Sequence, residues 1–334
     1  MKILHCPVPI ARQPWLLSRA QRKLGAESDV MIFRTGPYWE LDSDYNFHLE
    51  KYQGRMQKLV AASKAAVFVP KALIKYDVFH FHTKSILPNW YDAIIAKKLG
   101  KRIVFQIHGC EARLSNNHGF CKICQSYGRK YKLKTIEMVN KLGHLVIVVT
   151  PDLLNELPNA TWIPDSIDLE LWKPGGNQKK DDIVRIVHAS SDPEVKGTAY
   201  IQKAVQNLKK DGYKVELLFL TNVPNTKVRE FCLQADIAVD QLLIGSYGVN
   251  AIETMAMGIP TCAFIREDLV EKYPNDLPLM NASKDNIEEK LRMLIEDKKL
   301  REKIGKRSVS FANEYHDHLK NGGKLLKMYE EIKT

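Results

Sequence analysis

The sequence lacks the features that mark several whole classes of protein. No apolar run approaches the ~20 residues that a membrane-spanning helix needs, and the stretch that follows Met1 is polar and does not resemble a signal peptide. The chain has only six Cys, so without a secretory signal we expect reduced thiols and no disulfide framework. These absences predict a cytoplasmic protein, for which contact with a membrane would be peripheral, at its inner face.

Nucleic-acid-binding signatures are also lacking, although the chain is basic overall. The net charge is +11, but no zinc-finger, helix-turn-helix or RNA-binding pattern accompanies it. Basic charge alone is weak evidence for a nucleic-acid partner, so we expect none.

Length and periodicity predict two α/β domains. A chain of 334 residues is about twice the length of an ordinary domain, and its hydrophobic content of 45% suffices for two cores. Strand-like runs alternate with amphipathic helical stretches in both halves, which predicts two parallel, doubly wound, Rossmann-like sheets. Pro, Asp and Gly cluster near residues 163–174. We therefore predict domains at 1–165 and 166–310, followed by a C-terminal helix at 311–334 that could cross back to the first domain. This last helix is expected to be continuous from about Arg301 to Ile332.

The positive charge is concentrated in the first half. Residues 1–165 contain 24 Lys and Arg against 13 Asp and Glu, whereas the remaining residues contain 26 against 26, so the first part carries the entire net charge. An excess of this size favours an anionic or lipid-linked acceptor, or an acidic membrane surface, although many such excesses only aid solubility.

One basic segment of the first half is the best candidate for membrane contact. Lys51, Arg55 and Lys58 fall at helical spacing on one face, and Leu59, Val60 and residues 62–67 are available for another face. The apolar face contains few large side chains. A surface helix packed on the first sheet is therefore the favoured interpretation.

The most informative stretch is residues 239–260, VDQLLIGSYGVNAIETMAMGIP. A β-branched run ends in a polar loop, Gly248 opens an amphipathic helix, and Glu253 lies in the first turns of that helix. The exposed N–H groups and positive end of a helix N-terminus bind anions, and a carboxylate one turn further can accept hydrogen bonds from a ribose diol. An ordinary strand–helix unit with a surface acid is the alternative. The pattern suits a nucleotide diphosphate.

A second strand end, RIVHASSDPEVKGTAYIQKAV from Arg185, presents a cation. A short apolar strand ends in small residues, and Lys196 and Gly197 lie at the entry to a helix. Open α/β sheets bind ligands at the carboxyl ends of their strands, where Lys196 is placed.

Taken together, these segments resemble the retaining GT-B glycosyltransferases of family four, which use nucleotide sugars. The resemblance rests on Lys196-Gly197, QADIAVDQ at 234–241, YGVNAIETMAMGIP at 247–260 and IPDSIDLELWKP at 163–174. It implies that Lys196 holds the donor phosphates and acts in catalysis, that Glu253 holds the ribose hydroxyls, and that the backbone of 247–250 holds the diphosphate or sugar. The implied donor site comprises Ser190, Lys196, Gly245, Ser246, Tyr247, Gly248, Val249, Asn250 and Glu253.

Three positions depart from the family pattern. Gly245 stands where the family usually has Glu, Ser190 where it has Arg, and Ser166 where its interdomain signature begins with Gly. Ser cannot replace the bidentate phosphate contact of Arg. Asp240 and Ser246 are possible substitutes for the missing Glu. A non-catalytic nucleotide-binding homologue or partner subunit is therefore an alternative to an enzyme.

Histidines collect at the ends of first-half strands, where chemistry usually occurs in such sheets. His80 and His82 lie in DVFHFH, and His108 precedes Gly109 in FQIHG. The resemblance implies that His108 lies beside the donor sugar and acceptor as a catalytic residue. His82 is a second candidate on the acceptor side. A packing histidine is the favoured interpretation for His80 and His82.

Four residues could hold a structural zinc ion. Cys110, His118, Cys121 and Cys124 are grouped, the last two as Cys-Lys-Ile-Cys. Such a Cys₃His set is typical of tetrahedral zinc, although a single Cys-x-x-Cys is a weak signal and buried free thiols are the favoured alternative.

The sequence thus predicts transfer of a sugar from a nucleotide diphosphate sugar to an acceptor hydroxyl with retention of configuration, in the synthesis of a polysaccharide, glycolipid or glycosylated metabolite. No acidic pair of the kind that binds metal in transferases follows a strand, since Asp42 and Asp44 lie in a long polar segment. We therefore expect a metal-independent hexosyltransferase that requires no cofactor. A related GT-B epimerase or phosphorylase is a further alternative.

Overall fold

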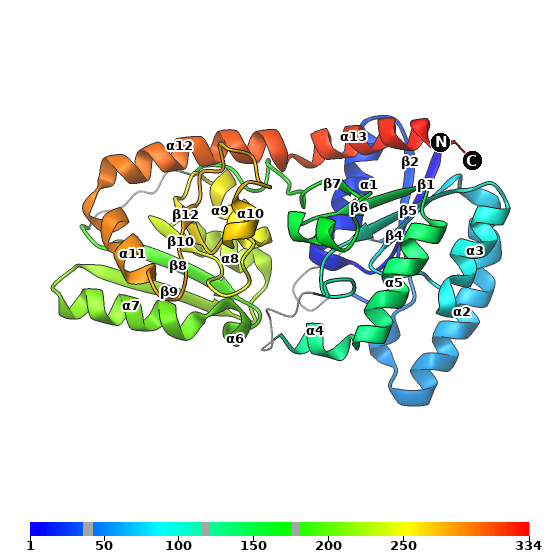
Figure 1. The fold of residues 1–334 in the computed structure, drawn as a ribbon, viewed down its shortest axis with the longest axis horizontal. Coiled ribbons are helices and arrows are strands. Elements are labelled where there is room, and N and C mark those ends of the chain that lie inside the picture. Colours follow the sequence, from blue (N-terminus) through cyan, green and yellow to red (C-terminus); the bar gives the residue numbers. More distant parts are fainter. Residues whose placement is uncertain (36–42, 115–120, 176–180, 334) are drawn as a thin grey trace. The chain divides into compact units, whose positions relative to one another are not determined.

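The computed structural model describes residues 1–35, 43–114, 121–175 and 181–333. The chain forms two compact units (Figure 1). The first contains Met1–Ser115, Ile123–Ser166 and His318–Thr334, and the second is built on Ile167–Asp317. The chain passes between units at 166–167 and at 317–318, compared with the predicted domain ends at 165 and 310.

The first unit is built on a parallel sheet, as the strand–helix alternation predicts. Its order is β3-β2-β1-β4-β5-β6-β7, in which β1 lies between β2 and β4, the arrangement of a doubly wound sheet. The strands are β1 (Lys2–Pro7), β2 (Glu27–Ile32), β3 (Tyr45–Asn46), β4 (Val78–His82), β5 (Arg102–Ile107), β6 (Leu145–Val148) and β7 (Thr161–Trp162).

Helices cover both faces of this sheet. Leu17, Leu325 and Tyr329 of α1 and α13 pack with Ile3 and Val78 on one face. The other face carries the aromatic side chains of β4 and β5 and is covered by α2, α3 and α5. The helices of this unit are α1 (Gln13–Lys23), α2 (Gly54–Lys75), α3 (Tyr91–Lys98), α4 (Lys122–Ser126), α5 (Arg129–Leu142) and α13 (His318–Glu331).

Glycine ends two of these helices. Gly25 follows α1 with φ +89°, and Gly100 follows α3 with φ +72°. A residue with a Cβ is strained at such angles, so glycine there lets the chain turn back toward the next strand.

The second unit has a smaller parallel sheet with the order β12-β11-β10-β8-β9. This result confirms the predicted fold class of two Rossmann-like domains. The strands are β8 (Val184–Ser190), β9 (Val215–Thr221), β10 (Ile237–Val239), β11 (Thr261–Ala263) and β12 (Met280–Asn281). The helices are α6 (Pro193–Lys196), α7 (Thr198–Lys210), α8 (Asn225–Cys232), α9 (Val249–Ala256), α10 (Glu267–Val270), α11 (Ile287–Glu296) and α12 (Lys298–Tyr315).

The end of the chain differs from the single helix that its periodicity suggests. Two helices, α12 and α13, are separated at His316 and Asp317. The carbonyl of His316 accepts a hydrogen bond from Ile167 N (2.9 Å), and Asp317 forms a β-bridge with Ile167. The backbone groups of His316 and Asp317 therefore pair with the linker at Ile167 instead of with the next turn of a helix, so the helix ends there.

Within the described ranges, no helix combines the length and apolar character needed to cross a bilayer.

Candidate active site

Lys196 lies at a sharp corner beyond the carboxyl end of β8. Asp192 caps α6 by accepting from Val195 N (3.3 Å), and Gly197, at φ +79°, separates α6 from α7. A Cβ at Gly197 would lie 3.2 Å from the Leu243 side chain, so glycine also permits the close approach of the next loop. That loop is anchored by a hydrogen bond from Leu242 N to Lys196 O (3.0 Å). The corner therefore fixes Lys196 against the loop after β10.

Asp240, the first residue after β10, joins the two predicted anion-binding groups. Its Oδ1 lies 2.6 Å from Lys196 Nζ, and its Oδ2 accepts from Gly248 N (2.7 Å). The side chain of Asp240 is fully buried, whereas that of Lys196 is 17% exposed. A buried carboxylate needs such partners, because an unpaired buried charge is strongly destabilising. The two strand ends identified separately in the sequence thus converge on one carboxylate.

Gly248 is the N-cap of α9, as the sequence predicts. A Cβ built there would lie 3.2 Å from Asp240 Oδ2 and 3.3 Å from Lys196 Nζ, so a side chain would crowd the cation. Val249 and Asn250 form the first turn of the helix, with their backbone N–H groups at its positive end. This turn and Lys196 therefore lie at the same place, where Asp240 offsets part of the ammonium charge.

The two residues before Gly248 are buried and hydrogen-bonded. Ser246 Oγ pairs with Tyr273 OH, and Tyr247 OH lies 3.2 Å from His316 Nε2. Because the Ser246 hydroxyl already has this partner, its clearest contribution is to shape the loop. Tyr247 likewise ties the loop to the end of α12.

Glu253 lies on the buried side of α9 and is 3% exposed. Its Oε1 accepts from Asn225 Nδ2 at the start of α8 (3.0 Å). A buried carboxylate oriented by an amide is suited to accept hydrogen bonds from neighbouring hydroxyls.

The structure gives a backbone reason for the departure at 245. Gly245 has φ +85°, and an added Cβ would lie 2.9 Å from Arg266 Cβ. A larger residue would be strained at this position, so the loop conformation requires glycine. Ser190, at the end of β8, is buried, and its Oγ has no hydrogen-bond partner among the described residues.

Ser166, the third departure, belongs to a tight junction in the first unit. Its backbone N donates to Gln13 Oε1 (2.8 Å), and its carbonyl accepts from Gln13 Nε2 (2.9 Å). Its hydroxyl accepts from Asn321 Nδ2 of α13 (2.9 Å). The Ser side chain therefore supplies an acceptor that glycine would lack.

His188 is a supporting residue that the sequence interpretation missed. Its Nδ1 lies 2.8 Å from the carbonyl of Val239, and its Nε2 lies 2.8 Å from Thr198 Oγ1. Burial lowers the pKa of His188 to about 4, so the ring is neutral at pH 7. The ring joins β8, the end of β10 and the start of α7, around the Lys196 corner. Its signal in the sequence was a polar residue inside the apolar strand RIVHAS.

The histidines of the first unit also lie together. His108, just after β5, places Nε2 3.3 Å from His82 Nδ1 and Nδ1 3.6 Å from Asp165 Oδ1. The His108 side chain is only 3% exposed, and its ring nitrogens face His82 and Asp165. Burial lowers the pKa of both His80 and His82 well below the usual value.

The cysteine group partly matches the predicted zinc set. Cys110 Sγ and Cys124 Sγ lie 3.1 Å apart, and the ligand atoms of Cys110, Cys121 and Cys124 all lie within 4.8 Å of one another. His118 falls outside the described residues. Three convergent thiols suit zinc, but zinc stays a prediction.

If the thiols hold zinc, protein purified without chelators should contain about one zinc ion per chain by mass spectrometry. Replacing Cys121 and Cys124 together with Ser should abolish it, because thiolate ligands are lost. The buried Cys232→Ser and Cys262→Ser variants are the matched control and should keep the metal. Metal-free wild-type protein with reactive thiols would contradict the prediction.

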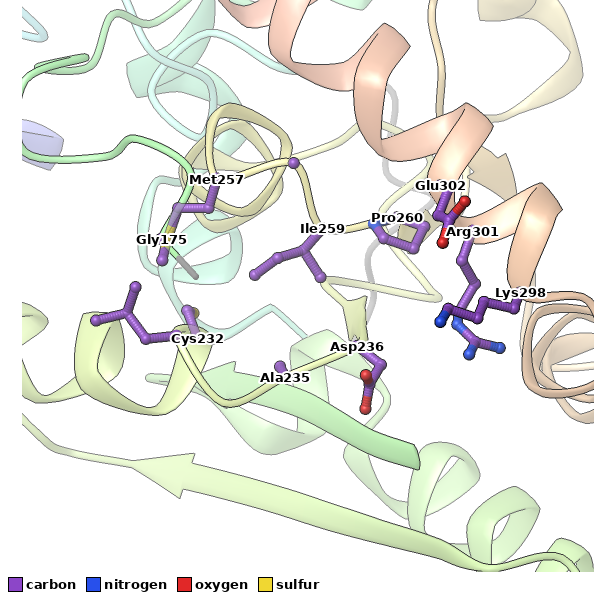
Figure 2. A pocket seen from close by; sticks show the side chains of 12 residues that line it. Gly175, Cys232, Ala235, Asp236, Met257, Ile259, Pro260, Lys298, Arg301 and Glu302 are labelled. Atoms are coloured by element: carbon purple, nitrogen blue, oxygen red, sulfur yellow. The ribbon is translucent and has the colours of Figure 1, made fainter. Parts of the chain in front are cut away.

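A cavity of about 240 Å³ in the second unit has none of the candidate donor-site residues in its lining. Figure 2 shows the side chains that do line it. Its lining includes Asp236 and Pro260, which precede β10 and β11. Ligands in open α/β sheets bind at the carboxyl ends of the strands, whereas this cavity lies at the amino ends. Its cations are Lys298 and Arg301, and Arg301 donates to the carbonyls of Leu294 and Ile295, so that side chain already serves the end of α11. The cavity is therefore not the candidate site.

A family comparison decides the class of protein. The model of Glycosyltransferase Family 4 matches residues 10–171. The matched segment is slightly less than half of the chain. The residues that suggested the family lie mostly after this match, in 163–260, so the two observations are largely independent. The resemblance to GT-B glycosyltransferases of the family-four type is confirmed.

Solved structures support the same fold for the whole chain. Sucrose-phosphate synthase from Thermosynechococcus elongatus matches with a TM-score of 0.72 and 12% identity, covering 99% of each chain. Anabaena HepE in complex with UDP-glucose matches with a TM-score of 0.66 and 13% identity, covering 99% of this chain and 100% of HepE. A UDP-N-acetylglucosamine 2-epimerase matches with 0.58 and 13%, covering 100% and 97%.

At these identities the structural matches establish the GT-B fold alone. Both a transferase and an epimerase are among them, so the fold alone does not distinguish these two activities. No curated protein sequence matched the chain significantly.

Proposed function

We propose that this glycosyltransferase moves a sugar from a nucleotide diphosphate sugar to an acceptor hydroxyl, with retention of anomeric configuration. The observation that carries the proposal is the convergence of Lys196, Asp240 and Gly248 N at the carboxyl ends of β8 and β10. A cation beside a helix N-terminus suits a diphosphate, and Glu253 on the same helix suits the ribose. The donor would bind the second unit and the acceptor the first.

The diphosphate would share Lys196 with Asp240. Both oxygens of Asp240 are used, by the ammonium group and by Gly248 N. A donor phosphate would approach the partly exposed ammonium and the N-terminal turn of α9, while Asp240 keeps Lys196 in position. As the glycosidic bond breaks, these groups would stabilise charge on the leaving diphosphate.

Two observations favour transfer over a non-catalytic role. Gly245 has a backbone angle that requires glycine. Its presence therefore has a structural reason and is not by itself a sign of lost activity. Lys196 and the α9 N-terminus also lie together, although Ser190 stands where the family usually has Arg. An epimerase would use the same nucleotide site, and only its products distinguish it.

The identity of the donor and the reaction class are tested together. A thermal-shift screen against nucleoside diphosphates and their sugars should give stabilisation that grows with ligand concentration, since binding to the folded state raises the melting temperature. With the donor found, product analysis should show a glycoside only when acceptor is present. If epimerised sugar nucleotide forms without acceptor, the protein is an epimerase and the transfer proposal is wrong. If the donor binds without any turnover, the protein has a non-catalytic role.

Transfer should not depend on a divalent metal. Because Lys196 and backbone N–H groups would carry the phosphate charge, we expect the transfer rate to survive EDTA within about twofold. The measurement must be the initial rate with folding followed in parallel, since EDTA would also remove a structural zinc. Loss of activity restored by magnesium or manganese would contradict the expectation.

We also propose that the acceptor side of the first unit works at an acidic membrane surface. Helix α2 packs on the sheet through small or branched residues, Ala65, Val69 and Ala72, as expected for a surface helix. It leaves a further apolar stripe exposed, formed by Met56, Leu59, Val67 and Ile74, with Ile74 85% exposed. Spacings of eleven and seven residues bring Met56, Val67 and Ile74 to nearly the same side of the helix.

Charge near this stripe favours lipid over a protein partner. Arg55, Lys58 and Lys71 of α2 are exposed, as is Lys51. Lys51 lies in a 3-10 turn before α2 begins at Gly54, so the prediction that it shares a helical face with Arg55 and Lys58 is wrong. The first 165 residues carry the whole net charge of the chain. An exposed apolar stripe with adjacent cations is typical of helices that lie in an acidic membrane interface.

Replacing Lys51, Arg55 and Lys58 together with Gln should weaken binding to phosphatidylserine vesicles on the order of a hundredfold, since each cation near such a surface contributes about 1 kcal/mol. Sedimentation with vesicles measures it. The control replaces exposed Lys209, Lys210 and Lys214 of the second unit with Gln and should bind like wild type. Equal binding by both variants, or equal binding to neutral vesicles, would remove the membrane proposal.

A further inference from the structure

Two cations, Arg34 and Lys84, lie at the carboxyl edge of the sheet of the first unit. Arg34 comes two residues after the end of β2, and Lys84 comes two residues after the end of β4. In the sheet, β1 lies between these strands, and all three run parallel. Their carboxyl ends therefore share one edge, which is the edge where open α/β sheets bind ligands.

Lys84 also lies beside the topological switch point of this sheet. Helix α1, which follows β1, packs on one face, where Leu17 joins Ile3. Helix α3, which follows β4, packs on the opposite face, where Ala93 and Ala96 join the aromatic side chains. The connections after two neighbouring strands thus leave in opposite directions. Doubly wound sheets bind their ligands outside the strand ends at such a point, and Lys84 is in the loop between β4 and α3.

The backbone holds Lys84 in an unusual turn. Its N–H donates to the carbonyl of His82 (2.8 Å), and the residue between them, Thr83, has φ +70°. A β-branched residue rarely adopts a positive φ, and three-residue turns with such a central residue are rare and strained. Strained conformations persist where the surrounding structure enforces them, and they cluster at ligand-binding sites. The turn therefore fixes the start of this loop at the strand end.

Phe33 brings the two cations together. The Nζ of Lys84 lies 5.6 Å from the centre of the Phe33 ring, and Arg34 is the next residue along the chain. The Phe33 N–H donates to Pro7 O at the end of β1 (3.2 Å), and its carbonyl accepts from Leu49 N (2.9 Å). The face of an aromatic ring attracts a cation without neutralising it. Phe33 therefore connects the loops after β2 and β4 and leaves the ammonium charged.

Within the described part of the chain, the side chains of Arg34 and Lys84 form neither hydrogen bonds nor ion pairs. Both residues are exposed. Desolvation of the ammonium group, and after it repulsion by Arg34, lower the pKa of Lys84 below its usual value. The two positive charges thus act on each other, and both remain available to a ligand.

The acids of the neighbouring segments have other partners. Glu50, in the turn before α2, pairs with His48 (3.2 Å). Asp92, on α3, is fully buried and accepts from Ile86 N (2.8 Å). Two like charges that have no acidic partner in the described ranges repel each other, so this edge of the sheet favours an anion from outside.

The number of charges indicates the kind of anion. A phosphate monoester carries about −1.5 to −2 charges at pH 7 and matches two cations, whereas a carboxylate carries a single charge. The guanidinium of Arg34 can donate two parallel N–H groups to phosphate oxygens, and the ammonium of Lys84 adds a compact point charge. The pair is therefore suited to a terminal phosphate.

We propose that Arg34 and Lys84 form an anion site for a phosphate group on the acceptor, so that the sugar is transferred to a hydroxyl of a phosphorylated molecule. The assignment of this phosphate to the acceptor rests on the proposed function, whereas the anion site itself rests only on residues of the first unit. A soluble sugar phosphate and a lipid-linked phosphate present the same group, so only a comparison of the two as acceptors distinguishes them.

The diphosphate of the donor is the other phosphate that these cations could hold. Lys196 and the N-terminal turn of α9 provide for it in the second unit. Removing Arg34 and Lys84 should therefore leave the affinity for nucleoside diphosphates unchanged.

Binding of inorganic phosphate tests the site without turnover. In protein labelled with carbon-13 at arginine, the Cζ signal of Arg34 is assigned through Arg34→Gln and followed by NMR during a phosphate titration, with nucleoside diphosphate in excess to occupy the donor site. We expect a saturable shift of this signal, and an affinity that falls about tenfold or more in Lys84→Gln because a charge-assisted contact is lost. An Arg34 signal that does not move, or equal affinity in Lys84→Gln, overturns the proposal.

A matched control removes positive charge at the opposite edge of the same sheet. Lys23→Gln with Lys98→Gln changes two exposed residues at the ends of α1 and α3, which lead to the amino ends of β2 and β5. This control should leave the phosphate titration of Arg34 as in wild type. A loss equal to that in Lys84→Gln would show a general effect of charge and would overturn the site.

Turnover tests the role of the site in acceptor binding. With the donor identified, a soluble sugar phosphate and a lipid-linked phosphate in vesicles are each compared with their dephosphorylated form. We expect Arg34→Gln with Lys84→Gln to raise the KM of the phosphorylated acceptor on the order of a hundredfold, because two charge-assisted contacts are lost. The KM of the dephosphorylated acceptor and the Kd of the nucleoside diphosphate should stay within about twofold of wild type.

The outcomes separate this inference from the proposed function. If the double variant leaves the KM of the phosphorylated acceptor unchanged, or if a carboxylate-bearing acceptor is preferred, the phosphate assignment is wrong. If no transfer occurs with any acceptor, the proposed function fails, and the phosphate titration still decides whether the anion site exists.

Discussion

Lys196→Ala should lower nucleotide diphosphate affinity by tenfold or more and also destabilise the second unit. The affinity loss follows from removing a charge-assisted contact, which contributes about 1.5–3 kcal/mol. The stability loss follows from leaving Asp240 fully buried without its cation, which costs about 3–5 kcal/mol. Calorimetric titration and thermal unfolding measure the two effects.

A double variant separates binding from stability. In Lys196→Met with Asp240→Asn, no buried charge is left unpaired, and the Asn oxygen can still accept from Gly248 N. We expect unfolding within a few degrees of wild type while nucleotide affinity stays at least tenfold weaker. Wild-type affinity in this variant would remove Lys196 from the donor site.

Glu253→Gln should weaken binding of nucleoside diphosphates by about tenfold or more. The carboxylate is buried on α9 and oriented by Asn225, so it can accept from both ribose hydroxyls, whereas an amide offers one oxygen and a competing N–H. The loss should be much smaller for 2′,3′-dideoxynucleoside diphosphates, which lack those hydroxyls. Calorimetric titration with both ligands tests this.

Two controls accompany the Glu253 variant. Glu271→Gln makes the same charge change at an exposed position of the same unit and should bind like wild type. Asn225→Ala removes only the orienting amide and should give an intermediate loss. If Glu253→Gln weakens ribose and dideoxyribose ligands equally, the acid acts through general charge and not through the ribose.

Much of the fold was predictable because the signals are local. Ile237–Val239 is the strand that its β-branched run predicts, and Gly248 caps the helix that follows. Side-chain periodicity and backbone preference act over a few residues, so both can be read along the chain. The continuous last helix was wrong because its break depends on Ile167, a residue far away in sequence.

In the candidate site, too, the residues with local sequence signals were predictable and the contacts between distant residues were not. Lys196 and Glu253 were found because each stands at a recognisable strand–helix junction. The sequence contains no sign that Asp240 would bond both Lys196 and Gly248 N, since those partners are 44 and 8 residues away. His188 was missed for the same reason, because a histidine within an apolar strand is indistinguishable from a packing residue until its partners are known.

By itself, the sequence determined the two Rossmann-like units, the strand-end position of the site, the location of the positive charge and the resemblance to a family. Only the tertiary structure decided why glycine is required at 245, how Asp240 joins two strand ends, and which atoms the buried ring of His188 bonds. The difference has a physical cause. Alternation and capping are set by neighbouring residues, whereas the cost of burying a charge or a ring nitrogen is set by partners that the sheet register brings together.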